Sequence, residues 1–254
     1  MKTLTKKLCL GLLIMLPLGL MAQTGYEIAK AMEDKVSPKD MKSNMTMVLT
    51  NKQGKTREST IRSITADDNK KQIIWFLAPA DDKGVAFLKI EHTDQDDEMR
   101  LWLPAFNKVR RISSKKKADS FMGSDLSYED MTSRELDEYS YELKGEKTVD
   151  GIDCYILEST PKAGITRTYK RFITFVSKAD LVSILDEAYD MQDNLLKRRV
   201  MKYVKQKSYD LPSEIFVENV QKMTNTRLKF SNLEVDTGVE PDLFQEKNLK
   251  RIPK

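Results

Sequence analysis

Residues 73–77 (Ile-Ile-Trp-Phe-Leu) are apolar at every position, which sets them apart from the other strand-like segments of this chain. Elsewhere apolar and polar residues alternate, as they do over residues 45–50, and this period of two is typical of a strand with one solvated face. An antiparallel strand that is apolar on both faces must be covered on both. Residues 85–90 also carry apolar residues on both faces. The sequence therefore predicts a sheet whose central strands carry protein or a ligand on each side.

The rest of the pattern predicts a meander of antiparallel strands. We expect strands over residues 45–50, 56–65, 73–77, 85–90, 101–103, 108–112, 139–149, 152–159, 169–176, 181–189, 195–206, 215–220 and 226–233. Asp150-Gly151 is the strongest hairpin signal, because this pair suits the positive φ angles of a tight two-residue turn. One short amphipathic helix is expected over residues 25–34. The apolar residues of the tail, Phe244 and Leu249 among them, are expected to dock on the sheet.

Residues 1–22 have the features of a signal peptide. Lys2, Lys6 and Lys7 precede an apolar stretch over residues 8–20, and cleavage is expected after Ala22. The stretch is short for a membrane span, which needs about 20 apolar residues, so an uncleaved anchor is the weaker alternative. We expect an exported, periplasmic protein in which residues 23–254 form a single domain.

Loss of that segment changes the composition in two ways that bear on function. Three lysines and no acids leave with it, so the net charge falls from +4 to +1, which argues against a nucleic-acid partner. Cys154 becomes the one remaining cysteine, so an intramolecular disulfide is impossible. We expect Cys154 to be a buried small hydrophobic residue and stability to be independent of reductant.

Residue types that carry catalysis are scarce. The single histidine, His92, lies in an acidic run over residues 91–98 that lacks the glycine and terminal glutamate of a calcium loop and suits a solvated hairpin turn. One histidine and one cysteine cannot build a zinc site. A serine triad would need His92, and the chain has no Gly-x-Ser-x-Gly motif. The sequence predicts a protein that is not an enzyme and that uses no metal or cofactor.

Residues 99–131 are the most informative stretch. A strand ends at Pro104, a second strand covers residues 108–112, and a basic run over residues 115–117 precedes an apolar pair and Gly123. Residues 127–130 (Ser-Tyr-Glu-Asp) fit the capping box of a helix. Large apolar residues beside glycine and charge either dock in a core or cover a ligand site.

Three motifs in this stretch resemble a known family. Leu-Trp-Leu-Pro, Lys-Val-Arg-Arg-Ile-Ser-Ser and Asp-Ser-Phe-Met-Gly-Ser-Asp-Leu-Ser-Tyr-Glu-Asp-Met are similar to the outer-membrane lipoprotein-sorting family, and more narrowly to a long branch of LolA-like periplasmic lipoprotein and lipid carriers. The resemblance implies a mainly β fold, a curved antiparallel half-barrel sheet with short helices covering its concave face around a lipid-sized cavity. It also implies lipid or lipoprotein acyl chains as ligands, with an inner-membrane exporter and an outer-membrane acceptor as partners.

Two groups of residues are the candidates for that function. The residues expected to line the cavity and its lid are Trp75, Phe76, Phe87, Trp102, Phe121, Met122, Tyr128 and Met131. Their alternative role is ordinary core packing. Lys108, Arg110 and Arg111 form the second group, which is either a solvated face or a rim that meets an acidic partner or anionic headgroups.

Two functions remain open at this point. The first is a non-enzymatic carrier that holds acyl chains for outer-membrane sorting, with residues 121–131 as a movable lid. The second is a non-catalytic envelope scaffold, or an accessory protein of a membrane lipid exporter, whose cavity is filled by its own side chains. If the lid is separate from the core, Phe121→Glu should leave the fold intact while Trp75→Glu unfolds it.

Overall fold

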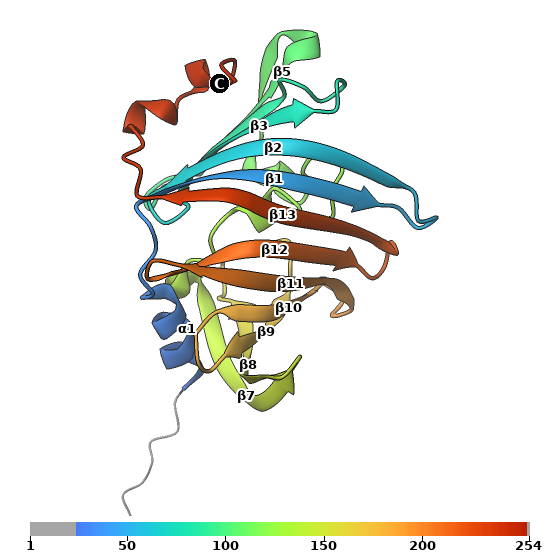
Figure 1. Ribbon diagram of the computed structural model, residues 1–254. Coiled ribbons are helices and arrows are strands. Elements are labelled where there is room, and N and C mark those ends of the chain that lie inside the picture. Colours follow the sequence, from blue (N-terminus) through green and yellow to red (C-terminus); the bar gives the residue numbers. More distant parts are fainter. Residues whose placement is uncertain (1–23, 253–254) are drawn as a thin grey trace, which may run out of the picture.

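The computed structural model describes residues 24–252, so the predicted signal peptide lies outside the described residues. In that part of the chain thirteen strands form one curved antiparallel sheet (Figure 1). The strands are β1 (Asp40–Thr50), β2 (Thr56–Ala66), β3 (Lys71–Ala78), β4 (Ala86–Ile90), β5 (Glu98–Leu103), β6 (Lys108–Arg111), β7 (Tyr139–Val149), β8 (Ile152–Pro161), β9 (Arg171–Ser177), β10 (Ser183–Tyr189), β11 (Leu195–Gln206), β12 (Tyr209–Asn219) and β13 (Thr224–Val235). The predicted mainly β, antiparallel fold is confirmed.

The strand order determines what covers the sheet. It runs β6-β5-β4-β3-β2-β1-β13-β12-β11-β10-β9-β8-β7, so the first and last strands pair in the middle while β6 and β7, which are consecutive in sequence, form opposite edges. Residues 112–138 must therefore pass from one edge of the sheet to the other. They do so across its concave face, where their apolar side chains pack on the inward-facing residues of β1 to β5.

Both faces of β3 are buried, as the sequence predicts. Phe76 points to the concave face and is fully covered by the crossing segment. Trp75 points to the convex face, where Phe244 and Leu249 of the C-terminal tail pack over it. The apolar run of β3 is thus explained by two separate protein covers, and the expected docking of the tail is confirmed.

The one α-helix of residues 24–252, α1 (Gly25–Glu33), covers the far end of the concave face. Its N-terminus is a capping box in which Thr24 N–H donates to the Glu27 carboxylate at 2.7 Å and Glu27 N–H donates to the Thr24 hydroxyl at 3.2 Å. Ile28 is fully buried against β8 and β9. The helix sits so close to β7 that a Cβ on Gly25 would lie 2.9 Å from the backbone of Glu142, so a larger residue would push the helix away.

The predicted helix after residues 127–130 is reduced to one turn. The capping contacts form, since Ser127 N–H donates to Asp130 at 2.7 Å and Asp130 N–H donates to the Ser127 hydroxyl at 3.2 Å. Only the 3-10 turn η3 (Glu129–Met131) follows. The next residues are held extended because Ser133 N–H donates to Glu91 at 2.9 Å. Apart from α1, the concave cover among the described residues is therefore loop with single 3-10 turns rather than helices.

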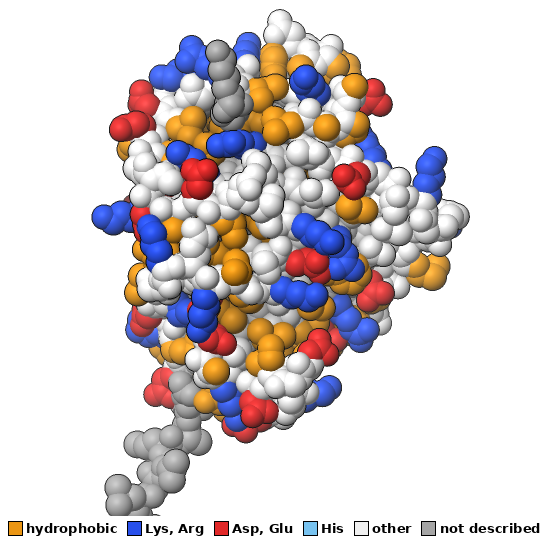
Figure 2. Space-filling model, in the orientation of Figure 1, with side chains coloured by type: hydrophobic (Ala, Val, Ile, Leu, Met, Phe, Trp, Pro, Cys, Tyr) orange, Lys and Arg blue, Asp and Glu red, His pale blue; other side chains and the backbone are white. Residues whose placement is uncertain are grey.

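Figure 2 shows one face of the molecule, on which basic and acidic side chains are interspersed between apolar patches. No large area of one sign is visible on that face, which agrees with the near-neutral composition of residues 23–254.

Candidate functional site

We call residues Asp119–Arg134 the cavity loop. Its tip is a tight turn closed by a hydrogen bond from Phe121 N–H to the Leu126 carbonyl at 2.8 Å, with Met122 and Gly123 at positive φ. The turn pushes the Phe121 ring into the sheet, where only 3% of the residue remains exposed. Its centroid lies 5.2 Å from the Phe87 ring and 5.8 Å from the Tyr128 ring.

An apolar cavity of about 300 Å³ lies between the cavity loop and the concave face of the sheet. Its apolar lining comes from β1, β2, β3, β12 and β13 and from the loop itself: Met41, Met45, Met47, Ile61, Ile74, Phe121, Leu126, Met131, Pro212, Ile215, Leu228 and Phe230. Its polar lining is Ser43, Ser63, Thr65, Asn69, Gln72, Asp130 and Arg199. Asn69 is exposed in the β2–β3 turn, so the cavity reaches the surface at that end.

Hydrogen bonds fix the loop to the central strand β13 and to β4. On β13, the hydroxyl of Thr226 donates to the Asp125 carboxylate at 2.9 Å, and the Thr224 hydroxyl donates to the same carboxylate at 2.5 Å. On β4, the ammonium of Lys89 donates to the Met131 carbonyl at 2.8 Å. The loop thus depends on polar contacts at its tip, through Asp125, and near its C-terminal end, through Met131, as well as on the packing of Phe121.

Lys89 is a buried charge that serves this attachment. Its side chain has no exposed surface, and its ammonium lies 2.5 Å from the carboxylate of Glu91, which is also buried. Burial lowers the pKa of Lys89, and the negative charges of Glu91 and Asp97 oppose that shift. An ion pair in this position needs its remaining hydrogen-bonding capacity satisfied, and the cavity loop supplies both the Met131 carbonyl and the Ser133 N–H.

A second charged cluster, on β9 to β11, holds the same C-terminal part of the loop from the opposite half of the sheet. Asp186 is 3% exposed and pairs with Arg199 at 2.6 Å and with Arg134 of the loop. The Thr174 hydroxyl donates to the same carboxylate at 2.6 Å. Burial would raise the pKa of Asp186, but the two guanidinium groups outweigh it and hold the pKa below its usual value.

Asp130 is the next member of this cluster. It accepts hydrogen bonds from the Lys197 ammonium at 2.8 Å and from the Tyr169 hydroxyl at 2.9 Å. Burial would raise its pKa, but the charges of Lys197 and Arg199 lower it further than burial raises it. Burial also raises the pKa of Tyr169, and the neighbouring Asp130 carboxylate adds to that shift, so Tyr169 remains a neutral donor.

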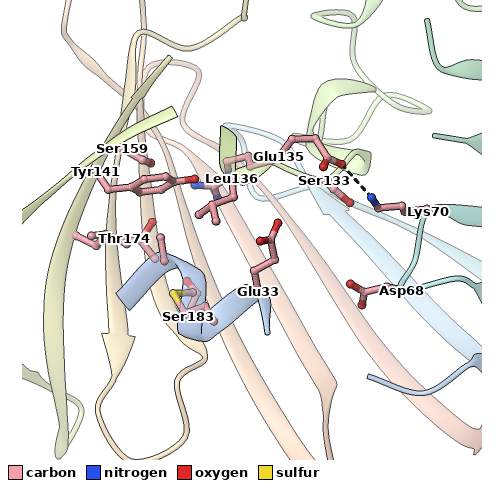
Figure 3. Close-up of a pocket in the computed structure, with 14 residues that line it drawn as sticks. Glu33, Asp68, Lys70, Ser133, Glu135, Leu136, Tyr141, Ser159, Thr174 and Ser183 are labelled. Atoms are coloured by element: carbon pink, nitrogen blue, oxygen red, sulfur yellow. Dashed lines mark ion pairs between the residues drawn. The ribbon is translucent and has the colours of Figure 1, made fainter. Parts of the chain in front are cut away.

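A larger and more polar pocket of about 480 Å³ lies beside this cluster, between α1, the end of the loop and β7 to β10 (Figure 3). Glu33, Asp68 and Glu135 supply negative charge to its wall, and Lys70 forms an ion pair with Glu135 at 3.5 Å. This wall is too charged for an aliphatic ligand, so the apolar cavity is the stronger candidate site.

The structure divides the predicted cavity residues into two sets. Phe76, Phe87, Phe121, Met122, Tyr128 and Met131 come together in one cluster on the concave face. Of these, Phe121 and Met131 line the cavity, and the others pack behind them. Trp75 and Trp102 lie on the convex face beneath the tail, so they do not line the cavity. Successive side chains of a strand point to opposite faces of the sheet, so Trp75 lies on the face opposite Phe76. The C-terminal tail, not a ligand, covers both tryptophans.

The predicted basic rim lies on the edge strand β6, away from the cavity lining. Lys108, Arg110 and Arg111 are all exposed, and within residues 24–252 none of them forms an ion pair. Lys108 and Arg110 alternate with Val109, which packs toward the convex cluster. Charged side chains on a short edge strand also discourage pairing with another sheet.

Sequence reasoning missed the polar part of the site. From their own segments alone, these side chains would be assigned to the surface: Asp130, Asp186, Lys197 and Arg199. Lys197 and Arg199, for example, alternate along a strand that is largely polar. One local signal was available. Ser43 stands on the same face as Met45 and Met47, at a position where the apolar alternation would place another large residue.

Two other kinds of functional feature are absent from the described residues. No group of three or more His, Cys, Asp and Glu side chains in residues 24–252 is arranged to hold a metal ion. No helix in the same residues is long and apolar enough to cross a membrane.

An open, curved antiparallel sheet with a covered apolar cavity on its concave face defines the LolA-like class of fold. The LolA superfamily protein from Nitrosomonas europaea shares this fold, with a TM-score of 0.70 and 17% identity over 88% of this chain and 98% of that one. The DUF1329 family protein from Desulfovibrio piger is 35% identical over 89% of this chain and 97% of its own, with a TM-score of 0.83. This chain belongs to the DUF1329 family.

Two further comparisons agree. A domain from Vibrio parahaemolyticus, described as a candidate outer-membrane lipoprotein-sorting protein, is 30% identical over 89% of this chain and 98% of that one, with a TM-score of 0.84. A family model described as an uncharacterized protein matches residues 68–251. No curated protein matches the chain. The resemblance to the outer-membrane lipoprotein-sorting family is thus confirmed.

Proposed function

We propose that this protein is a non-catalytic periplasmic carrier that binds an acyl chain of a lipid or lipoprotein in the apolar cavity beneath the cavity loop. The observation that carries the proposal is the cavity itself, with an apolar wall contributed by five strands and the loop. The description of the Vibrio relative as a lipoprotein-sorting protein supports it. Residues 1–22 would direct export to the compartment where such a carrier is needed.

The physical need for such a site is large. Each CH₂ group of an acyl chain costs about 0.8 kcal/mol in water, so a chain that crosses an aqueous compartment requires a dry cavity. At about 300 Å³ the cavity lies at the lower end of the range for ligand pockets. A cargo with two or more chains would therefore have to displace the cavity loop.

The exposed residues of β6 give this carrier a surface for partners. Lys108, Arg110 and Arg111 are unpaired cations within the described chain, and Phe106, in the turn before them, is 70% exposed. Such a surface suits the anionic headgroups of a membrane or the acidic face of an exporter or acceptor protein. The proposal gives these residues a role in delivery rather than in binding the acyl chain.

A cavity-filling variant tests the proposal. Ile215 is half-buried at the cavity wall, and Ile215→Trp should fill much of the space without placing a charge in it. We expect at least a tenfold loss of affinity for a fluorescent fatty-acyl probe, with the thermal midpoint little changed. Val204→Trp, on the exposed face of β11, is the matched control and should bind the probe normally.

Two results would count against the proposal. If the wild-type protein takes up no acyl probe, the cavity is a packing defect and the scaffold function is favoured. If Ile215→Trp binds as tightly as the wild type, the ligand lies elsewhere.

A further inference from the structure

The cavity has a polar end that acyl-chain binding alone does not explain. Ser43 on β1 pairs directly with Ser63 on β2, and Gln72 on β3 donates through Nε2 to the Ser63 hydroxyl at 3.3 Å. All three side chains line the cavity and are at least nine-tenths buried, with 2%, 3% and 9% exposed. They form a polar belt across three adjacent strands, beside the apolar wall of Met45, Ile61 and Ile74.

Three groups at this end lack hydrogen-bond partners. Among the described residues, the Ser43 hydroxyl, the Gln72 carbonyl oxygen and the Arg199 Nε are buried atoms without a partner. A buried polar group that is left unpaired costs free energy, and native structures seldom retain several such groups around one cavity without a use. Here two donors and one acceptor line the same space.

The charge at this end favours an anion. Arg199 belongs to the cluster of Arg134, Lys197, Asp130 and Asp186, which carries three positive charges and two negative ones. Both carboxylates are already committed, since Asp186 holds two guanidinium groups and Asp130 holds Lys197 and Tyr169. Within these five side chains one positive charge is left unmatched, and Arg199, which lines the cavity, is the member with a buried donor that has no partner among the described residues.

We propose that this polar end is a head-group site for a single-chain amphiphile with a carboxylate head, a fatty acid. The carboxylate would accept hydrogen bonds from Arg199 and Ser43, and the chain would lie along Met45, Met47 and Ile61 toward Phe121. The inference rests on the proposed function, because it uses the same cavity, and it narrows the ligand to one chain and one negative charge. A cavity of about 300 Å³ accommodates one chain more readily than two.

The test compares two probes that share a tail. Laurate and dodecanol have the same twelve-carbon chain, and at pH 8 only laurate carries a charge. Calorimetric titration of delipidated protein should give about tenfold tighter binding for laurate, since a hydrogen bond to a charged group is stronger than one to a neutral group. Ser43→Ala should reduce that difference about threefold, since Arg199 remains, without lowering the thermal midpoint, because the hydroxyl it deletes has no protein partner among the described residues.

Ser59→Ala is the matched control. Ser59 is also a buried serine on a neighbouring strand, but its hydroxyl lies 3.4 Å from Asp82 and it does not line the cavity. It should bind both probes as the wild type does. Equal affinities for laurate and dodecanol, unchanged in Ser43→Ala, would overturn the head-group site and leave the carrier standing. Failure of both probes to bind would overturn the proposed function and this inference together.

Discussion

The ammonium of Lys197 on β11 lies 2.8 Å from the carboxylate of Asp130 in the cavity loop, and each side chain is 11% exposed. The contact joins positions 67 residues apart in sequence. Together with Arg134 and Asp186 it ties the loop to the half of the sheet that the Phe121 cluster does not reach. The closed position of the loop therefore depends on buried charge as well as on apolar packing.

Removing that carboxylate should destabilise the protein strongly. In Asp130→Asn, Lys197 keeps its charge but loses its counter-ion in a buried position. We expect the free energy of unfolding to fall by about 3 kcal/mol, which urea denaturation would measure. Asp34→Asn is the control, because Asp34 pairs with Lys30 on the exposed surface of α1, where loss of the pair should change the free energy of unfolding far less. Equal effects of the two variants would show that the Asp130 contact does not hold the loop.

The same carboxylates predict how stability depends on pH. Asp130 and Asp186 have folded-state pKa values below the unfolded value of about 3.9. The unfolded chain therefore binds these protons first as the pH falls. Their contribution to stability is complete above about pH 5 and is lost as the pH drops through 3.9 and then through the folded pKa values.

We expect urea midpoints to be flat with respect to these two groups between pH 7 and 5 and to fall steeply from pH 4 to 3. Asp130→Asn should show a shallower fall over that lower range, since one of the two groups no longer titrates. If the urea midpoint of Asp130→Asn falls with pH as steeply as that of the wild type, Asp130 is not paired in solution.

The tail should contribute to stability from the convex face. Phe244 is 4% exposed and packs in the cluster that contains Trp75 and Trp102. Phe244→Ala should lower the free energy of unfolding by about 3 kcal/mol and shift tryptophan emission to the red as water reaches these rings. Ile252→Ala, at a residue that is 38% exposed, should do neither. A stable Phe244→Ala protein with unchanged emission would show that the tail is not docked.

Phe121 should behave as a core residue. It is 3% exposed and Trp75 is 1% exposed, so a carboxylate at either position would be buried without a partner. We expect Phe121→Glu and Trp75→Glu each to cost about 3 kcal/mol or more in the free energy of unfolding. This replaces the sequence-based expectation that Phe121→Glu is tolerated. An unchanged thermal midpoint for Phe121→Glu would instead show that the loop detaches without loss of the fold.

Local pattern was sufficient to predict most of the strands and the two-sided burial of β3. The alternation of side-chain direction along a strand also places Trp75 and Phe76 on opposite faces of the sheet. It does not say which face is concave, because that depends on the pairing of β1 with β13, strands almost two hundred residues apart. Only that pairing makes β6 and β7 opposite edges and sends residues 112–138 across the concave side.

The polar part of the site is a product of the same long-range pairing. Asp130 and Lys197 look like surface charges in their own segments, and nothing within a few residues of either marks the other as its partner. Strand β12 shows the same limit on a smaller scale. It begins at Tyr209 rather than near Ile215, since the polar residues and Pro212 at its start conceal a strand that its neighbours stabilise.

The most direct test of the account is mass spectrometry of lipid extracted from protein that has been purified from the envelope without detergent. The carrier function predicts an acyl-chain compound that co-purifies at up to one molecule per protein and is depleted in Ile215→Trp but not in Val204→Trp. Wild-type protein that carries no lipid, and takes up none when it is offered, would contradict it.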